Sequence, residues 1–165
     1  MNVPHIYLKR GACLIDKLIK VVATGFGSGL VPFAPGTAGT LLGVLVYLAL
    51  SRMSWTLYCV FLVVLTLLAC YVSHEAERMF GEKDPPRVVI DEVVGFQWTM
   101  FLVGPTFFHV FAGFVLFRFL DILKVFPAGY FQRRLSGGIG IVMDDVVAGM
   151  YGNIALLIMI RFWGI

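Results

Sequence analysis

The chain has 165 residues, of which 59% are apolar and 14% are charged, and its formal net charge is +3. Soluble domains usually carry about 25% charged residues, so this composition excludes an ordinary soluble domain and indicates a membrane protein. The small net charge gives no electrostatic support for binding nucleic acid. The length predicts one membrane-embedded domain, residues 1–165.

The N-terminal region is predicted to lie on the cytoplasmic surface of a membrane. It lacks the uninterrupted apolar stretch of a signal peptide. Residues 9–20 hold four basic side chains against one acid, which is typical of an amphipathic segment on anionic lipid. Residues 21–40 are rich in Gly, Pro, Ser and Thr. We expect a loop there, because a regular helix cannot continue through Pro32 and Pro35.

Two apolar segments are long enough to be transmembrane helices. Residues 54–72 contain no charge and would reach about 28 Å as a helix, close to the hydrocarbon thickness of about 30 Å. Residues 146–163 are predicted to form the final apolar helix. Residues 41–50 are also apolar and, with 37–40, give a shorter apolar segment of about 14 residues.

Between these segments lies a short apolar hairpin. Its legs, residues 93–103 and 106–120, meet at Gly104-Pro105. Each leg would span only about 17–23 Å as a helix, so the hairpin either re-enters the membrane or crosses it with local thinning. The prediction is therefore an all-α, multi-pass integral membrane bundle with a short or re-entrant hairpin. The distribution of basic residues places the polar segments 74–92 and 121–145 in the cytoplasm.

Five of the ten acidic residues fall at the ends of apolar segments on this cytoplasmic side: Asp91, Glu92, Asp121, Asp144 and Asp145. Helix capping could explain Asp91 or Asp144 alone. It explains neither Asp121, at an expected helix C-terminus, nor two adjacent pairs of acids. Clustered carboxylates repel one another unless a cation lies among them, and hard oxygen ligands suit Mg²⁺. The five carboxylates are therefore predicted to be Mg²⁺ ligands.

Basic and hydroxyl side chains near these acids are predicted to bind a phosphate. Arg118, Asp121 and Lys124 are spaced so that they share one helix face, and Arg118 could orient Asp121 while Lys124 contacts the phosphate. The alternative is a plain row of surface ion pairs. The segment that includes Thr37 and Thr40 could cradle phosphate oxygens at a helix N-terminus.

The glycines of the first loop have a structural alternative. Gly25 and Gly29, and likewise Gly39 and Gly43, have the GxxxG spacing of closely packed helices. Neither this loop nor the glycines at 137–140 match a dinucleotide-binding motif or a P-loop.

Four stretches together resemble the bacterial phosphatidylglycerophosphatase A family. They are GFGSGLVPFAPGTAGT at 25–40, IDEVVG at 90–95, FRFLDILK at 117–124 and GGIGIVMDDVVAG at 137–149. The resemblance implies a multi-pass protein of the bacterial cytoplasmic membrane that removes the terminal phosphate of phosphatidylglycerol phosphate, with Mg²⁺, to give phosphatidylglycerol. Its partners would be this lipid and the surrounding membrane lipids, and the sequence indicates no particular oligomeric state.

The resemblance also implies site positions. The family's acidic pairs fall on Asp91-Glu92 and Asp144-Asp145, its D-x-x-K element on Asp121 and Lys124, and its PGT segment on 35–37. The family usually has proline directly after this lysine, where the chain has Val125.

Two mechanisms are open at this point. The carboxylates Asp91, Asp121, Asp144 and Asp145 could support attack by water on phosphorus, with one or two Mg²⁺ ions. Alternatively, one aspartate could attack directly and form an acyl phosphate.

A small cation-coupled transporter or channel subunit is the alternative function, since acids in membrane segments often mark ion paths. Such a protein usually has mid-membrane acids and internal repeats. Here the acids lie at segment ends, which favours the phosphatase. A non-catalytic scaffold would leave the five carboxylates unexplained.

Overall fold

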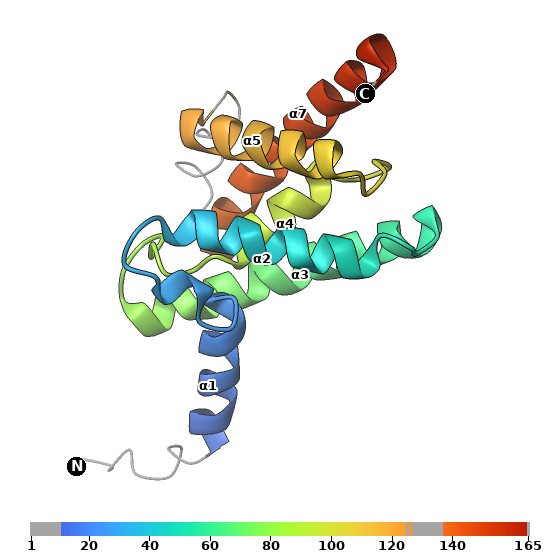
Figure 1. Cartoon of the computed structure of the whole chain (residues 1–165). Helices are drawn as coiled ribbons and strands as arrows, with labels where there is room; N and C mark the ends of the chain where they lie inside the picture. Colours follow the sequence, from blue (N-terminus) through green and yellow to red (C-terminus); the bar gives the residue numbers. More distant parts are fainter. Residues whose placement is uncertain (1–10, 125, 127–136, 165) are drawn as a thin grey trace, which may run out of the picture.

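The computed structural model describes residues 11–124, 126 and 137–164. This described part contains six α-helices, one short 3₁₀ helix and no strand (Figure 1). The elements are α1 (Gly11–Ala23), η1 (Ser28–Leu30), α2 (Pro35–Leu50), α3 (Trp55–Phe80), α4 (Ile90–Thr99), α5 (Phe107–Leu123) and α7 (Gly138–Trp163). The all-α prediction is thus confirmed for these residues. Most of the segment between α5 and α7 lies outside the described residues.

The loop predicted for residues 21–40 is shorter than expected. Helix α1 continues to Ala23 and α2 already begins at Pro35, which leaves a connection that contains η1. Proline fits the first turn of a helix because its missing N–H would have no partner there. Ala34, with φ 52°, turns the chain into the helix.

The glycines of this region have two different roles. Gly39 and Gly43 lie on the face of α2 that packs against α4, where added side chains would press on Val89 and Phe96. The close-packing interpretation holds for this pair. The GxxxG helix-packing interpretation is wrong for Gly25 and Gly29, because they lie in the connection between α1 and α2 rather than on one helix, although both are closely packed there.

Helix α3 contains the predicted transmembrane segment 54–72 and extends beyond it. Ser54 caps its N-terminus by accepting a hydrogen bond from the Leu57 N–H. The helix ends at Phe80, because Gly81 takes a left-handed conformation with φ 65°. The last two turns of α3 are polar, so the helix carries the chain out of the apolar region toward the loop that precedes α4.

Helix α4, which contains most of the first expected hairpin leg, lies at the centre of the fold. Helices α2, α3, α5 and α7 all pack against it, and eight of its ten residues are buried: Ile90, Asp91, Val93, Val94, Gly95, Phe96, Gln97 and Thr99. The expected leg 93–103 is therefore a short internal helix that starts three residues earlier and ends at Thr99. The second leg, in α5, contacts α4 directly, and α7 packs against both helices.

Helix α7 begins earlier than expected, at Gly138 rather than near residue 146. A Cβ atom at Gly138 would collide with the backbone carbonyl of Cys70, so the first turn of α7 lies directly against the backbone of α3. As a result Asp144 and Asp145 stand in the second turn of the helix. Helix capping therefore does not explain either residue.

Buried polar side chains tie α4 to its neighbours. The Gln97 side chain donates to the Gly43 carbonyl of α2 at 2.8 Å and accepts from the Tyr58 hydroxyl of α3 at 2.9 Å. From α7, the Asn153 amide donates to the carbonyls of Thr99 and Phe101. Such satisfied interhelical hydrogen bonds are typical where the surrounding medium offers no water. They fix the position of α4.

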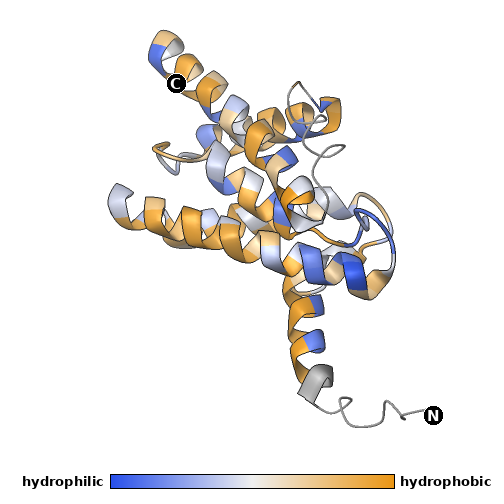
Figure 2. Cartoon of the chain, turned by 180° about the vertical axis from the view of Figure 1, so that it is seen from behind, coloured by the Kyte–Doolittle hydropathy of each residue, from blue (hydrophilic) through white to orange (hydrophobic). Residues whose placement is uncertain are grey.

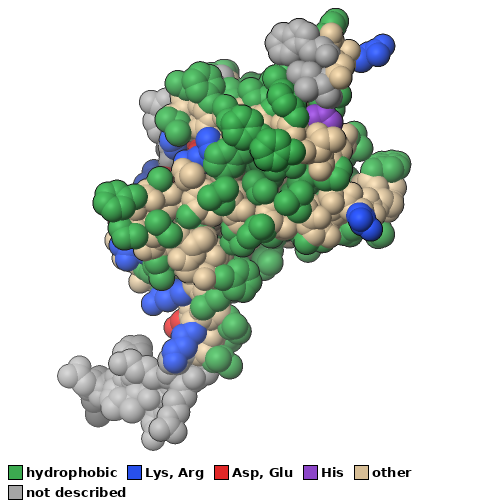
Figure 3. All heavy atoms as spheres, in the orientation of Figure 1, with side chains coloured by type: hydrophobic (Ala, Val, Ile, Leu, Met, Phe, Trp, Pro, Cys, Tyr) green, Lys and Arg blue, Asp and Glu red, His purple; other side chains and the backbone are tan. Residues whose placement is uncertain are grey.

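The outside of the bundle is apolar. Figure 2 shows hydrophobic residues along α3 and α7, and Figure 3 shows apolar side chains covering much of one face. Helix α3 and residues Gly138–Phe162 of α7 are long and apolar enough to cross a membrane. Exposed apolar surfaces this large are rare on soluble monomers, so the chain has the surface of a membrane protein.

Helix α1 extends away from the other helices (Figure 1). It exposes Leu14, Ile15 and Leu18, together with the basic residues Lys17 and Lys20. This two-sided helix agrees with the amphipathic pattern in the sequence. Its position on the membrane surface stays a prediction.

Candidate active site

All five predicted carboxylates line a single cavity of about 300 Å³. Its walls come from the N-terminus of α2, the loop before α4, the start of α4, the end of α5 and the second turn of α7. The side chains of interest are Asp84, Asp91, Glu92, Arg118, Asp121, Lys124, Asp144 and Asp145. The expected convergence of acids from three separate parts of the chain is therefore present in the structure.

Three of the carboxylates form the tightest group. One oxygen each from Asp91, Glu92 and Asp145 can be chosen so that all lie within 4.8 Å of one another. Asp91 and Asp145 are 7% and 4% exposed. Buried oxygens of all three side chains, Oδ1 of Asp91, Oε2 of Glu92 and Oδ2 of Asp145, have no hydrogen-bond partner within the described part of the chain.

A glycine contact between α4 and α7 allows this approach. Gly95 follows Asp91 by four residues and Gly149 follows Asp145 by four residues, so each glycine lies one turn from its aspartate on the same helix face. A Cβ atom at Gly149 would collide with the Gly95 carbonyl, and one at Gly95 would meet the Phe117 ring and the Asp145 carbonyl. The two backbones therefore touch one turn away from the carboxylates.

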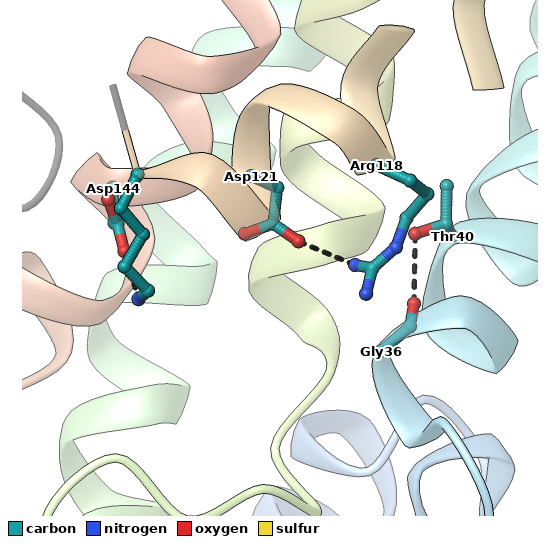
Figure 4. A network of polar contacts seen from close by, with 6 residues as sticks. Gly36, Thr40, Arg118, Asp121 and Asp144 are labelled. Atoms are coloured by element: carbon teal, nitrogen blue, oxygen red, sulfur yellow. Dashed lines mark hydrogen bonds and ion pairs between the residues drawn. The ribbon is translucent and has the colours of Figure 1, made fainter. Parts of the chain in front are cut away.

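Arg118 approaches the carboxylates from α5. Its guanidinium donates to Asp121 Oδ2 at 2.6 Å, and both side chains are largely buried. Figure 4 shows Arg118 reaching from α5 toward Gly36 at the start of α2. A Cβ atom at Gly36 would lie 3.0 Å from the Arg118 guanidinium and would collide with Glu92 Oε1. Glycine at this position keeps the cavity open between these two side chains.

Lys124 takes a different position from the one its spacing predicted. It caps the C-terminus of α5 with φ 47°, so it does not continue the helix face of Arg118 and Asp121. Its ammonium instead reaches α7 and donates to Asp144 Oδ2 at 2.6 Å. Two cations therefore reach the carboxylates: Asp121 holds the guanidinium of Arg118, and Asp144 holds the ammonium of Lys124.

Burial and mutual repulsion change the acidity of the group. Burial, with the neighbouring Glu92 charge second, raises the pKa of Asp91 well above its ordinary value. Burial, followed by the charge of Asp145, raises the pKa of Glu92 to about 8. A carboxylate site with raised pKa values and unpartnered oxygens is stabilised by a cation, so these residues fit a hard divalent ion.

The two threonines predicted to bind substrate, Thr37 and Thr40, do not line the cavity as the acids do. Ala34, Pro35 and Gly36 line the cavity, but Thr37 and Thr40 are not among its lining residues. Thr40 is fully buried and its hydroxyl donates to the Gly36 carbonyl at 2.9 Å, as Figure 4 shows. The start of α2 therefore meets the cavity through its backbone and small residues.

Asp84 is a cavity residue that the sequence analysis missed. It lies in the loop before α4, next to Pro85 and Pro86, and has φ 52°. Its sequence neighbourhood, EKDPPR, reads as an ordinary polar turn. The sequence did contain one indication that Asp84 belongs to the site: it precedes two prolines, and the next acidic pair follows only a few residues further on.

The comparisons with known proteins agree with this geometry. The family model described as phosphatidylglycerophosphatase A matches residues 21–160. Proteins named phosphatidylglycerophosphatase A are 37% identical in Escherichia coli, over 79% of this chain and 76% of that protein, and 39% identical in Haemophilus influenzae, over 88% and 90%.

A third relative has a different name. A Bacteroides thetaiotaomicron protein provisionally named a phosphatidylinositol-3-phosphatase is 40% identical over 84% of this chain and 91% of its own length. No solved structure matches the chain. The family model, which matches residues 21 to 160, covers every residue that lines the cavity. The chain belongs to the phosphatidylglycerophosphatase A family.

Proposed function

We propose that this protein hydrolyses the terminal phosphomonoester of phosphatidylglycerol phosphate and releases phosphatidylglycerol and inorganic phosphate. One observation carries the proposal: carboxylates from three parts of the chain line one cavity with two cations, Arg118 and Lys124. Relatives over most of the chain are named for this reaction. The cavity combines groups that hold a divalent cation with groups that bind phosphate.

Asp91, Glu92 and Asp145 are the residues that would hold Mg²⁺. One oxygen from each residue lies close enough to the others to share one ion, and each side chain has a buried oxygen with no hydrogen-bond partner among the described residues. Oxygen ligands are the ones Mg²⁺ prefers. When bound, the ion supplies positive charge that offsets the charge of the phosphate. Asp121 and Asp144 are engaged by Arg118 and Lys124, so their main role in this proposal is to position these two cations.

The chain's own residues then define the reaction. Arg118 and Lys124 bind and orient the phosphate oxygens from two sides. In the hydrolytic route a carboxylate accepts a proton from water, the water oxygen bonds to phosphorus, and the ester P–O bond breaks. The departing glycerol oxygen takes up a proton. In the other route an aspartate oxygen attacks first and water later cleaves the acyl phosphate.

We propose a multi-pass arrangement in the bacterial cytoplasmic membrane with the cavity on the cytoplasmic side. The apolar exterior and the two long apolar helices support it. The cavity brings together the loop before α4 and the end of α5, the two regions that the distribution of basic residues assigns to the cytoplasm. A site at this level can act on a lipid headgroup while the acyl chains stay in the bilayer. The acids lie near helix ends, which does not favour the transporter alternative.

Incubation of the purified protein with phosphatidylglycerol phosphate is expected to release inorganic phosphate with Mg²⁺ and not with EDTA. Phosphatidylinositol 3-phosphate, suggested by the name of the Bacteroides relative, serves as the competing substrate and is expected to react more slowly. A phosphate assay on both lipids checks this. Absence of metal-dependent phosphate release would refute the proposed activity. Faster phosphate release from phosphatidylinositol 3-phosphate would make that lipid the substrate in place of phosphatidylglycerol phosphate.

Mg²⁺ binding is expected to release protons and to tighten as pH rises from 6 to 9. Burial raises the pKa values of Asp91 and Glu92, that of Glu92 to about 8, so the Glu92 carboxyl holds a proton near neutral pH that the metal must displace. Calorimetric titration in buffers of different ionisation enthalpy measures the number released. If Mg²⁺ binding released no protons and its affinity did not depend on pH, these carboxyls would not be the Mg²⁺ ligands.

A further inference from the structure

A second hollow, of about 410 Å³, adjoins the carboxylate cavity. It is lined by Gly29, Leu30, Val31, Pro32, Pro35, Pro86 and Arg87. Pro35 and Pro86 belong to the walls of both hollows. The two spaces are therefore neighbours, and they differ in chemistry: the first is rich in carboxylates, while the second combines apolar side chains with one arginine.

The wall that carries Arg87 is held in place from several directions. A Cβ atom at Gly29 would collide with the Arg87 carbonyl, so η1 lies directly against this backbone. Two residues further on, the Val89 N–H donates to the Ala23 carbonyl of α1 at 2.9 Å. The guanidinium of Arg87 lies over the Phe80 ring, 5.0 Å from its centre. The backbone of Arg87 is therefore held against η1, while its guanidinium packs on the Phe80 ring.

Glu82 is the acidic group paired with Arg87, and the pairing is loose. The two charged groups are 3.7 Å apart and both side chains are about half exposed. The ion pairs of the carboxylate cavity are much closer, at 2.6 Å, and more buried. A surface pair of this kind contributes little, so a second anion can compete for the same guanidinium.

The proposed substrate carries two phosphates in different chemical forms. Its terminal phosphomonoester is separated by one glycerol unit from a phosphodiester, which in turn is joined to the diacylglycerol. Carboxylates crowd the first cavity, so the diester needs a cation outside it. Arg87 is the cation in the adjoining hollow. Leu30, which lines the same hollow, and the strongly exposed Phe33, three residues further along the chain, offer apolar surface for the lipid part.

We propose that this second hollow is the subsite for the phosphodiester of the lipid, with Arg87 as its binding group. This inference rests on the proposed function, because it places the terminal phosphate of the same lipid in the carboxylate cavity. Arg87 then distinguishes a substrate with two phosphates from a simple phosphomonoester. Its position over Phe80 keeps the guanidinium extended while the diester binds.

The test compares Arg87→Gln with the wild-type protein and with Arg78→Gln. Arg78 is a matched control, because it is also an exposed arginine paired with a glutamate but lines neither hollow. Short-chain phosphatidylglycerol, which carries only the diester, and inorganic phosphate are titrated separately into each detergent-solubilised protein. Arg87→Gln is expected to weaken phosphatidylglycerol binding about tenfold, the usual effect of losing one charge-assisted hydrogen bond. The affinity of Arg87→Gln for inorganic phosphate is expected to stay at the wild-type value. Arg78→Gln is expected to bind both phosphatidylglycerol and inorganic phosphate as the wild type does.

Kinetics give the second readout. Arg87→Gln is expected to raise KM for phosphatidylglycerol phosphate about tenfold with little change in kcat, because it removes binding shared by ground and transition states. Arg87→Lys should restore part of the loss. Unchanged phosphatidylglycerol binding, or equal weakening for phosphate and phosphatidylglycerol, would overturn the subsite. A wild-type protein that releases no phosphate would instead refute the proposed function, while the binding titrations still decide the role of Arg87.

Discussion

Asp145→Asn is expected to lower phosphate release from phosphatidylglycerol phosphate by a factor on the order of 10²–10³, because losing a carboxylate ligand removes several kcal/mol of charge stabilisation. Asp145 is almost fully buried and contributes an oxygen to the tightest carboxylate group. Asparagine has nearly the same shape but lacks the charge. Initial rates at saturating Mg²⁺ measure the effect.

The stability of this variant separates a lost ligand from a damaged fold. In EDTA, Asp145→Asn is expected to melt at the wild-type temperature or above it, since it removes one of three crowded carboxyl groups whose ionised forms repel one another. Added Mg²⁺ should raise the melting temperature of the wild type more than that of the variant. Asp16→Asn, a change at an acid of α1 outside the cavity, is the control and should behave as wild type. Wild-type activity in Asp145→Asn would remove this residue from the site.

Gly149→Ala is expected to destabilise the protein and also to impair catalysis. The added methyl group would collide with the Gly95 carbonyl and lie 2.9 Å from the Trp98 Cβ, so α4 and α7 must move apart. Overpacking of this kind costs about 1–3 kcal/mol. Because the contact lies one turn from Asp145 and its neighbours on α4, a shift of about 1 Å there could reduce turnover by about 10²-fold. Thermal unfolding and initial rates on the same preparation measure both effects.

Gly104→Ala provides the matched control for this change. Gly104 lies in the connection between α4 and α5, where the nearest atom to an added Cβ is 3.8 Å away. The same methyl group should therefore leave stability and turnover close to the wild-type values. If Gly149→Ala behaved like Gly104→Ala, the close contact between α4 and α7 would not be what positions the carboxylates.

The α4–α7 contact also shows where prediction from the sequence reached its limit. The sequence places acids at the ends of apolar segments and so indicates that Asp91 and Asp145 lie on one side of the membrane. It does not reveal which helix lies between which others. Helices α4 and α5 contact each other as expected, but α2, α3 and α7 also pack against α4. This enclosure was not predicted, because the apolar run of α4 resembles a lipid-exposed leg equally well.

The two boundary errors at helix starts have different causes. Pro35 and Gly138 both looked like positions in loops, since proline and glycine interrupt helices. At the first turn of a helix proline costs nothing, and glycine is needed where α7 meets the Cys70 carbonyl of α3. The second cause is a tertiary contact, which local sequence patterns do not contain.

The amino-acid sequence by itself determined the membrane character, the helical class and the identity of the carboxylates, because composition, apolar length and charge are properties of the chain that do not depend on its path. Only the tertiary structure decided how those carboxylates are divided. It brings Asp91, Glu92 and Asp145 together and leaves a buried oxygen of each without a hydrogen-bond partner among the described residues. It also pairs Asp121 with Arg118 and Asp144 with Lys124. It also adds Asp84 to the cavity and sets Arg87 beside it. The reason is physical: which charges meet depends on helix contacts at Gly36, Gly95 and Gly149, and such contacts exist only between segments far apart in the sequence.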